Sequence, residues 1–288
     1  MKKFLIIPFL FTLVLFSCTK EINITLPEAT KKIVIDGGIF AGDYAEVNLT
    51  WSTGYFDPVD SASLQNYLIQ NAVAYVKDGN LTDTLHLAFD ATRAIPLVWK
   101  GNTILGQSGH TYTITVIADG QTATASTKIY PAVPLDSVWF KIEPNQDTLG
   151  FAWAHLTDPA TPDNGYRWFT KRINQDDRFR APFGSSFDDR FVQGQSFDFA
   201  YNRPSDPGST APEDTNGEAG FFKVGDTIAV QFCSIGQAEV NFFRTFEEQI
   251  GNNGNPFAAP GEIETNVVGG LGIFCGYNPS YDTIYCHP

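Results

Sequence analysis

Tyr112–Ser126 reads YTITVIADGQTATAS, and this stretch decides the fold class. Apolar and polar side chains alternate before Asp119-Gly120, and threonine or serine recurs at every second position after it. Because successive side chains of a strand point to opposite faces, a period of two predicts a strand on each side. Asp-Gly between two such runs is typical of a type I′ turn, since glycine adopts a positive φ at little cost. The stretch therefore predicts a β-hairpin.

Runs of the same kind occupy the first half of the chain. Apolar residues alternate with polar ones over Val47–Trp51 and Leu85–Phe89, which predicts strands with one buried and one wet face. Short alternating strands with turn residues between them predict an immunoglobulin-like β-sandwich over residues 31–132. Tyr130–Pro134 contains two prolines, which cannot donate to a ladder, so we place the domain boundary there.

The second half, residues 133–288, predicts a β-rich domain with one helix. Strand-like runs include Leu149–Ala154 and Asp226–Ser234. Near residues 237–250, apolar side chains recur at steps of three and four, as on one face of a helix. The stripe comprises Val240, Phe242, Phe243, Phe246 and Ile250, with Gly251 as the residue after the helix. We interpret the stripe as core packing, and the expected fold class is mainly β.

The N-terminus has the pattern of a lipoprotein signal peptide. Lys2 and Lys3 precede an apolar run from Phe4 to Phe16, which is shorter than the ~20 residues that span a bilayer. The run ends in Leu15-Phe16-Ser17-Cys18, which resembles a bacterial lipobox. We therefore predict a signal peptide at 1–17, lipid attachment at Cys18 and a polar tether over 18–30.

The charge balance restricts the partners. The chain has 19 Lys and Arg residues against 32 Asp and Glu, a formal net charge of −13. Nucleic-acid binding is driven by neutralisation of phosphates, so we expect no nucleic-acid partner. The four histidines and the cysteines fit no zinc-ligand spacing, and no metal or cofactor is expected.

Three cysteines remain once Cys18 is assigned to the lipid. An exported protein meets an oxidising compartment, where one disulfide and one spare thiol are the simplest expectation. We predict a disulfide between Cys233 and Cys275, which both lie in strand-like runs; the alternative is Cys275 with Cys286.

No catalytic motif is present. The chain lacks the Gly-x-Ser-x-Gly and His-Glu-x-x-His patterns. Gly269-Gly270-x-Gly272 lacks the Lys-Ser/Thr of a phosphate loop, and we interpret it as a bulge or a tight backbone approach. Asp176-Asp177, Asp188-Asp189 and Asp206 offer oxygens of the kind that bind Ca²⁺, but no calcium-loop pattern surrounds them, so solvated turn acids are expected. We expect no catalytic residues.

Two further features concern binding and modification. Trp99, beside Lys100-Gly101-Asn102, is the tryptophan we expect to be exposed for stacking on a ligand. Asp followed by Ser or Thr and then a small or aliphatic residue resembles a bacterial O-glycosylation acceptor, although the same pattern also begins strands. The acceptor positions are Ser61, Thr84, Ser137, Thr148, Thr227 and Thr283.

Several collinear segments resemble one known family. They include Ile33–Gly38, Phe187-Asp188-Asp189-Arg190-Phe191, Gly225–Ile235, Asn241–Glu247 and Gly269–Tyr277. Together with Cys18, they resemble the Bacteroidetes outer-membrane lipoproteins known as domain of unknown function four-two-four-nine, over nearly the whole mature chain. The resemblance implies a lipoprotein encoded beside TonB-dependent transporters, and it implies no known reaction or catalytic residue.

These observations lead to one expected function. The protein is expected to be a lipid-anchored outer-membrane protein at the cell surface, and a non-catalytic accessory or ligand-binding partner of a TonB-dependent nutrient transporter. Its partners would be the membrane, through the N-terminal lipid, and the transporter barrel. The alternatives are a structural or adhesive surface protein and, third, a surface hydrolase, which requires a cleft with two facing carboxylates. The sequence does not identify the ligand.

Overall fold

The computed structural model describes residues 30–54, 63–93, 95–205, 217–252 and 261–288. Lys31–Pro288 forms one compact unit. Strands predominate in this unit, which confirms the mainly β fold class. The predicted signal peptide, Cys18, the tether up to residue 29 and Ser61 lie outside the described residues.

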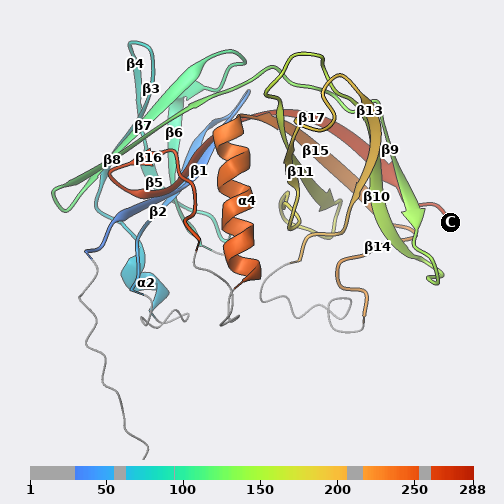
Figure 1. The fold of residues 1–288 in the computed structure, drawn as a ribbon. Coiled ribbons are helices and arrows are strands. Elements are labelled where there is room, and N and C mark those ends of the chain that lie inside the picture. The colour runs from blue at the N-terminus through green and yellow to red at the C-terminus, as the bar shows by residue number, and fades with distance from the viewer. Residues whose placement is uncertain (1–29, 55–62, 94, 206–216, 253–260) are drawn as a thin grey trace, which may run out of the picture. The chain divides into compact units, whose positions relative to one another are not determined.

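The largest sheet has eight strands in the order β12-β11-β15-β17-β1-β2-β6-β5 (Figure 1). β1 and β17 pair in parallel, from Val34 with Leu271 to Phe40 with Tyr277. The remaining pairs in the sheet are antiparallel. The strands are β1 (Ile33–Phe40), β2 (Tyr44–Trp51), β5 (His86–Phe89), β6 (Leu97–Leu105), β11 (Gly165–Arg172), β12 (Ser186–Asp188), β15 (Thr227–Ile235) and β17 (Leu271–Tyr285).

Two smaller sheets complete the β structure of the described residues. The five-stranded sheet has the order β16-β8-β7-β3-β4, and the other has the order β13-β10-β14 with β9 also paired to β10. The first contains β3 (Val73–Asp78), β4 (Leu81–Thr84), β7 (Thr111–Ala118), β8 (Gln121–Lys128) and β16 (Val267–Val268). The second contains β9 (Ser137–Ile142), β10 (Leu149–Thr157), β13 (Ser196–Tyr201) and β14 (Phe222–Lys223).

The predicted hairpin is confirmed as β7 and β8. Ala118 pairs with Gln121, and the two turn residues Asp119 and Gly120 have φ values of 46° and 76°. Positive φ at both positions is the requirement of a type I′ turn.

The glycine cluster is where the two predicted domains are joined. Gly272 has a φ of 98°, and a Cβ atom on it would lie 2.0 Å from the carbonyl oxygen of Ile35. A Cβ atom on Gly270 would lie 2.6 Å from the carbonyl oxygen of Ile33. This confirms the expected tight backbone approach. As a result, the predicted domains 31–132 and 133–288 share one continuous sheet.

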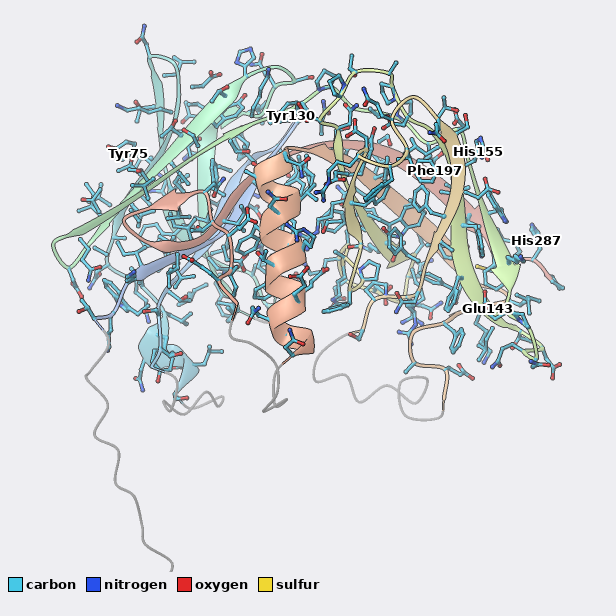
Figure 2. All side chains as sticks on the ribbon, viewed as in Figure 1. Tyr75, Tyr130, Glu143, His155, Phe197 and His287 are labelled. Atoms are coloured by element: carbon cyan, nitrogen blue, oxygen red, sulfur yellow. The ribbon has the colours of Figure 1, made fainter. Side chains whose placement is uncertain are left out.

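Each half nevertheless has its own core. One face of the eight-stranded sheet packs against the five-stranded sheet through residues such as Ile35, Val47 and Ile114. Farther along the same sheet, Trp168, Phe232 and Ile284 form a second core with β10 and β14, and Phe197 of β13 packs against it (Figure 2).

The opposite face of the eight-stranded sheet carries α4 (Gln237–Gly251), which confirms the predicted helix (Figure 1). Val240, Phe242 and Phe243 are buried in a third cluster with Cys275 and Tyr277. Phe246 and Ile250 remain 40% and 50% exposed, so only the first half of the predicted stripe is core. Gly251 is the last helical residue rather than the one after it. A single-turn helix, α2 (Leu64–Tyr67), precedes β3.

The alternating run Leu85–Phe89 does not form one half-buried strand. Leu85 is 2% exposed, but Phe89 is 71% exposed. The chain breaks there into β4 and β5, which belong to different sheets. β5 is an edge strand, so it lacks the neighbour that would cover its apolar side chains.

The structure contradicts the predicted disulfide, because Cys233, Cys275 and Cys286 are all buried free thiols. Cys233 pairs with Pro279 across β15 and β17, four residues beyond Cys275. Four residues of strand extend about 13 Å, whereas a disulfide joins Cα atoms about 4.4–6.8 Å apart. The alternative also fails, because Cys286 belongs to the second core and Cys275 to the third.

Candidate functional site

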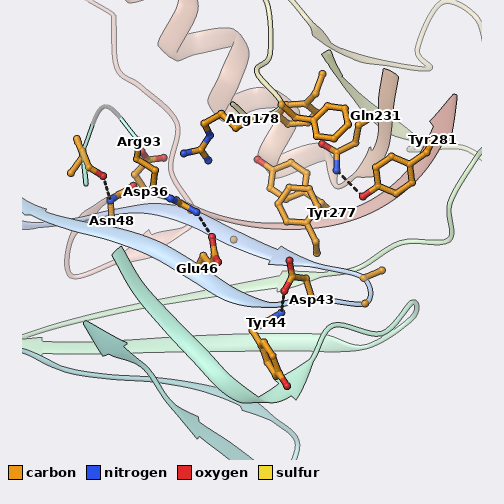
Figure 3. A pocket seen from close by; sticks show the side chains of 18 residues that line it. Asp36, Asp43, Tyr44, Glu46, Asn48, Arg93, Arg178, Gln231, Tyr277 and Tyr281 are labelled. Carbon is orange, nitrogen blue, oxygen red and sulfur yellow. Dashed lines mark hydrogen bonds and ion pairs between the residues drawn. The ribbon is translucent and has the colours of Figure 1, made fainter. Parts of the chain in front are cut away.

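A cavity of about 690 Å³ lies on the face of the eight-stranded sheet that carries α4 (Figure 3). Tyr277 places it there, because this side chain lines the cavity and also belongs to the cluster beneath the helix. Small-molecule sites have volumes of about 300–1,000 Å³. The cavity therefore has the size of a ligand site, and its walls come from both halves of the chain.

The floor is formed by the wet face of β1 and β2. Asp36 pairs with Asn48, and Gly38 pairs with Glu46 in the antiparallel ladder. Because Ile35 of β1 and Val47 of β2 point into the first core, alternation turns Asp36, Glu46 and Asn48 toward the cavity.

A cluster of ion pairs centred on Glu46 lies at the β2 side of the cavity floor. The Glu46 carboxylate forms ion pairs with Arg93 and Lys100, and the Arg93 Nε donates to Asp90 Oδ2 at 2.9 Å. The hydrogen bond that Lys100 donates to Glu46 raises the pKa of Lys100. Asn48 Nδ2 donates to the Leu97 carbonyl oxygen at 2.6 Å. These contacts attach the segment after Asp90 to the sheet and satisfy Glu46 within the protein.

Aromatic rings form the opposite wall. Phe40 and Tyr277 stack with ring centroids 4.4 Å apart, and Phe169 meets Tyr277 edge-on at 5.8 Å. Phe179 lies 6.1 Å from Tyr281, whose hydroxyl accepts a hydrogen bond from Gln231 Nε2 at 3.1 Å. Phe169, Gln231 and Tyr281 lie in register across β11, β15 and β17. The wall is therefore fixed by cross-strand packing and offers apolar faces to a ligand.

Two charged groups in the cavity have no partner. Among the described residues, the side chain of neither Asp36 nor Arg178 makes a hydrogen bond or an ion pair, and Figure 3 shows both side chains at the cavity. Burial and the charge of Arg93 lower the pKa of the Arg178 guanidinium. Asp36 is exposed to the open cavity, but the protein around it displaces bulk water, and this desolvation raises the pKa of its carboxyl against the influence of Arg167 and Arg93.

Arg167 supplies positive charge from behind the wall. Its guanidinium lies 5.2 Å from the ring centroid of Phe169 and 3.3 Å from that of Phe243 on α4. Its Nη1 donates to the Tyr277 hydroxyl at 3.5 Å, and its buried Nε has no hydrogen-bond partner. Arg167 thus connects the cavity wall to the helix and lowers the pKa of Asp36 from outside the lining.

The predicted glycosylation acceptors within the described residues do not line the cavity, and their exposure differs. Thr84, Ser137, Thr148 and Thr283 are exposed, and Thr227 is half-buried. Two of the preceding acids have structural roles: buried Asp83 accepts amide hydrogens from Asn102, Thr103 and Ile104, and buried Asp226 accepts one from Lys223.

Trp99 is buried rather than exposed. It is 6% exposed in the first core, and its Nε1 donates to the Ile69 carbonyl oxygen at 3.0 Å. The polar residues that follow Trp99 suggest an exposed turn, but β6 continues through them as a strand, and Trp99 lies on its buried face.

The acid pairs considered for calcium are engaged separately. Asp188 binds Arg190 and Gln237, buried Asp189 accepts from Asn164, and Asp176 pairs with Arg172. Asp206 lies outside the described residues. Within the part of the chain that the structure describes, no three His, Cys, Asp or Glu side chains are grouped to hold a metal ion.

The cavity residues were not singled out by sequence reasoning. Asp36 carried a signal, because it is an acid inside the otherwise apolar strand Ile33–Phe40. The sequence around Arg178 gives no such signal, because this residue lies in a polar, turn-rich segment. The position of that segment against β1 and β2 depends on the tertiary fold.

Comparisons with known proteins identify a family but no activity. Residues 19–282 match the family model described as Domain of unknown function (DUF4249). A comparison with curated proteins found no match. Among solved structures, a crystal structure of pullulanase type I from Bacillus subtilis str. 168 complexed with maltose is 8% identical and covers 73% of this chain and 24% of that chain, with a TM-score of 0.22. A TM-score this low supports no conclusion about fold or function.

The helices of the described residues were also compared with the length of a membrane span. None of them is both long enough and apolar enough to cross a bilayer.

Proposed function

Because the chain belongs to the DUF4249 family, whose function is unknown, we propose a function from the cavity: the protein binds a ligand on behalf of a TonB-dependent outer-membrane transporter, as a lipid-anchored and non-catalytic partner at the cell surface. The single observation that carries this proposal is the cavity of about 690 Å³, in which an unpaired acid and an unpaired arginine lie beside an aromatic wall.

The composition of the cavity supports ligand binding. Ligand sites combine apolar surface with a few convergent polar groups, and buried charged groups are normally paired. Arg178 is half-buried and Asp36 is exposed to the cavity, and both lack a side-chain partner among the described residues, whereas Glu46 beside them is paired twice. A ligand would supply the missing partners.

The sequence pattern at the N-terminus supports the membrane location. The lipobox-like Leu15–Cys18 after a short apolar run favours acylation at Cys18, and a lipid anchor would hold the cavity near an outer-membrane barrel. A ligand-binding module in that position fits delivery to a transporter.

A second candidate, a surface hydrolase, is favoured by one specific observation. Asp36, whose pKa is raised by desolvation, lines the same cavity as Glu46. A carboxyl whose pKa is raised, lying near a second carboxyl group, is the arrangement of many hydrolases. Against it, the two oxygens of Glu46 are engaged by Arg93 and Lys100 rather than turned toward a substrate. Release of products from tripeptides or trisaccharides by the purified protein, abolished by Asp36→Asn, would establish this candidate over the first.

Co-purification tests the leading proposal. The full-length chain with a C-terminal tag, produced in its native host and extracted from the outer membrane in mild detergent, should recover a TonB-dependent barrel identified by mass spectrometry. Cys18→Ala, which cannot be acylated, should lose both the membrane fraction and the barrel. Recovery of the protein without any such barrel in repeated extractions would contradict the proposal.

A further inference from the structure

We infer that the cavity binds a short peptide by its two charged ends, with the terminal carboxylate on Arg178 and the terminal ammonium on Asp36. This inference rests on the proposed ligand-binding function and names the class of ligand. It follows from the positions of the unpaired charges in the cavity and from the groups that lie between them.

Arg178 is suited to a carboxylate. The guanidinium is half-buried and lines the cavity, and none of its five donors is used by the described residues. Arg93, which also lines the cavity, is already paired with Glu46 and Asp90 and is not available to the carboxylate. A planar fork of donors matches a carboxylate with two parallel hydrogen bonds, and partial burial strengthens them.

Asp36 is suited to an ammonium group. Its carboxylate lies on the cavity floor and accepts no hydrogen bond from the described residues. Asn48 beside it cannot serve as the donor, because its amide nitrogen already donates to the backbone oxygens of Ile95 and Leu97. An ammonium group has three donors and would also offset the desolvation that raises the pKa of Asp36.

The two groups do not neutralise each other. Among the described residues, no hydrogen bond or ion pair joins the Asp36 carboxylate to the Arg178 guanidinium, although both side chains line the cavity. The cavity therefore presents one positive and one negative group that are not paired with each other. A free peptide carries opposite charges at its ends at neutral pH, and its ends are separated by at most about 10 Å in a tripeptide.

A polyanion fits this pattern less well. Among the acids of the lining, Glu46 is paired, but Asp36 and Asp43 are not paired with cations, and Asp43 only accepts the amide of Tyr44. An acidic oligosaccharide could use Arg178 but would be repelled by both aspartates. The aromatic wall of Phe40, Phe169, Phe179, Tyr277 and Tyr281 would hold a peptide side chain between the two ends.

Calorimetric titration of the purified full-length protein in detergent at pH 7 tests the inference with the tripeptide Ala-Phe-Ala. The free peptide should bind, and its C-terminal amide and its N-acetyl derivative should each bind about tenfold more weakly or worse. Trigalacturonate serves as an acidic saccharide of similar size and should not bind.

Two variants assign the ends. In Arg178→Gln the free peptide and its amide should bind equally, and in Asp36→Asn the free and acetylated peptides should bind equally. Arg190→Gln and Asp198→Asn, which remove exposed charges outside the cavity, should keep the wild-type preferences. Thermal melting checks that all four variants fold, as is expected because neither cavity charge has a partner to lose.

Each other result overturns the inference. It fails if the free tripeptide does not bind at millimolar concentration, if capped peptides bind as well as the free one, if the variants leave the preferences unchanged, or if only trigalacturonate binds. Co-purification of the barrel is a separate measurement. A barrel recovered without peptide binding leaves the accessory role standing and removes only the peptide.

Discussion

Gly38 lies opposite Cys275 in the parallel ladder between β1 and β17, and a Cβ atom on Gly38 would lie 2.0 Å from the carbonyl oxygen of Cys275. The contact is with backbone, so neither strand can yield without disturbing the ladder. This pair sets how closely the two halves of the chain approach in the middle of the shared sheet.

Gly38→Ala is expected to lower the free energy of unfolding by about 1–3 kcal/mol through overpacking, measured as a lower urea midpoint. Gly251→Ala is the matched control, because a Cβ atom there meets nothing within 4 Å. It lies at the end of α4 and should leave the midpoint unchanged or raise it slightly. Equal midpoints for both variants would show that the strands separate without cost.

Three free thiols are expected in the unfolded protein. In denaturant without reductant, a thiol reagent should label Cys233, Cys275 and Cys286, and the folded protein should react slowly because burial raises the pKa of each thiol. Only a thiolate reacts as a nucleophile. A peptide map with Cys233 linked to Cys275 would refute this.

Glu239 should make stability depend on pH. It is 4% exposed and accepts a hydrogen bond from Thr127 Oγ1 at 2.5 Å, and burial raises its pKa against that hydrogen bond. The folded state then holds its proton to higher pH than the unfolded state, so the contribution of Glu239 to stability falls as pH rises above about 4.5.

Glu239→Gln removes this ionisation and should gain stability relative to wild type as pH is raised through that window, measured by urea unfolding at several pH values. The exposed Glu262→Gln should run parallel to wild type. A constant difference between Glu239→Gln and wild type at every pH would mean that Glu239 does not titrate differently on unfolding.

Replacing a phenylalanine by alanine should lower the free energy of unfolding more in the first half of α4 than in the second half. Phe243 is 7% exposed and lies against Arg167, so Phe243→Ala should cost about 3 kcal/mol or more. Phe246 is 40% exposed and stacks on Phe242 at 5.7 Å, so Phe246→Ala should cost about 1 kcal/mol. Denaturant titration of both variants measures the difference, and equal losses would contradict the burial of the helix.

Glycans are expected on at least one exposed acceptor among Thr84, Ser137, Thr148 and Thr283. The intact mass of the exported protein should exceed that of the polypeptide plus lipid, and alanine at the modified position should remove the excess. A mass equal to peptide plus lipid would end this hypothesis.

Local sequence patterns were sufficient to predict the hairpin and the helix, but not which distant strands pair with each other. Asp119-Gly120 predicts its hairpin because the turn and both strands are contiguous, and the stripe at Val240 and Phe243 predicts α4 for the same reason. The parallel pairing of Val34 with Leu271 joins residues at opposite ends of the chain, and no local period encodes it. The free thiol at Cys233 follows from the register of β15 and β17, and the burial of Trp99 follows from packing in the first core, and neither can be read from a local period.

The candidate site escaped prediction for the same reason. Glu46 and Asn48 were expected on a wet face, and they are, but that face becomes the floor of a cavity only because Phe169 and Tyr281 arrive from later strands of the shared sheet. Arg178 completes the site from a loop.

The place of β17 in the sheet has a consequence for biogenesis. A nascent chain leaves the ribosome with β1 and β2 first, yet the strand that must insert between β1 and β15 is among the last to be made. Until β17 is made, the edge of β1 that faces away from β2 has no neighbour and the cavity lacks Tyr277 and Tyr281, so the central sheet cannot be completed before the C-terminal segment is synthesised. Loss of the C-terminal strand would open the sheet at its centre rather than trim its border.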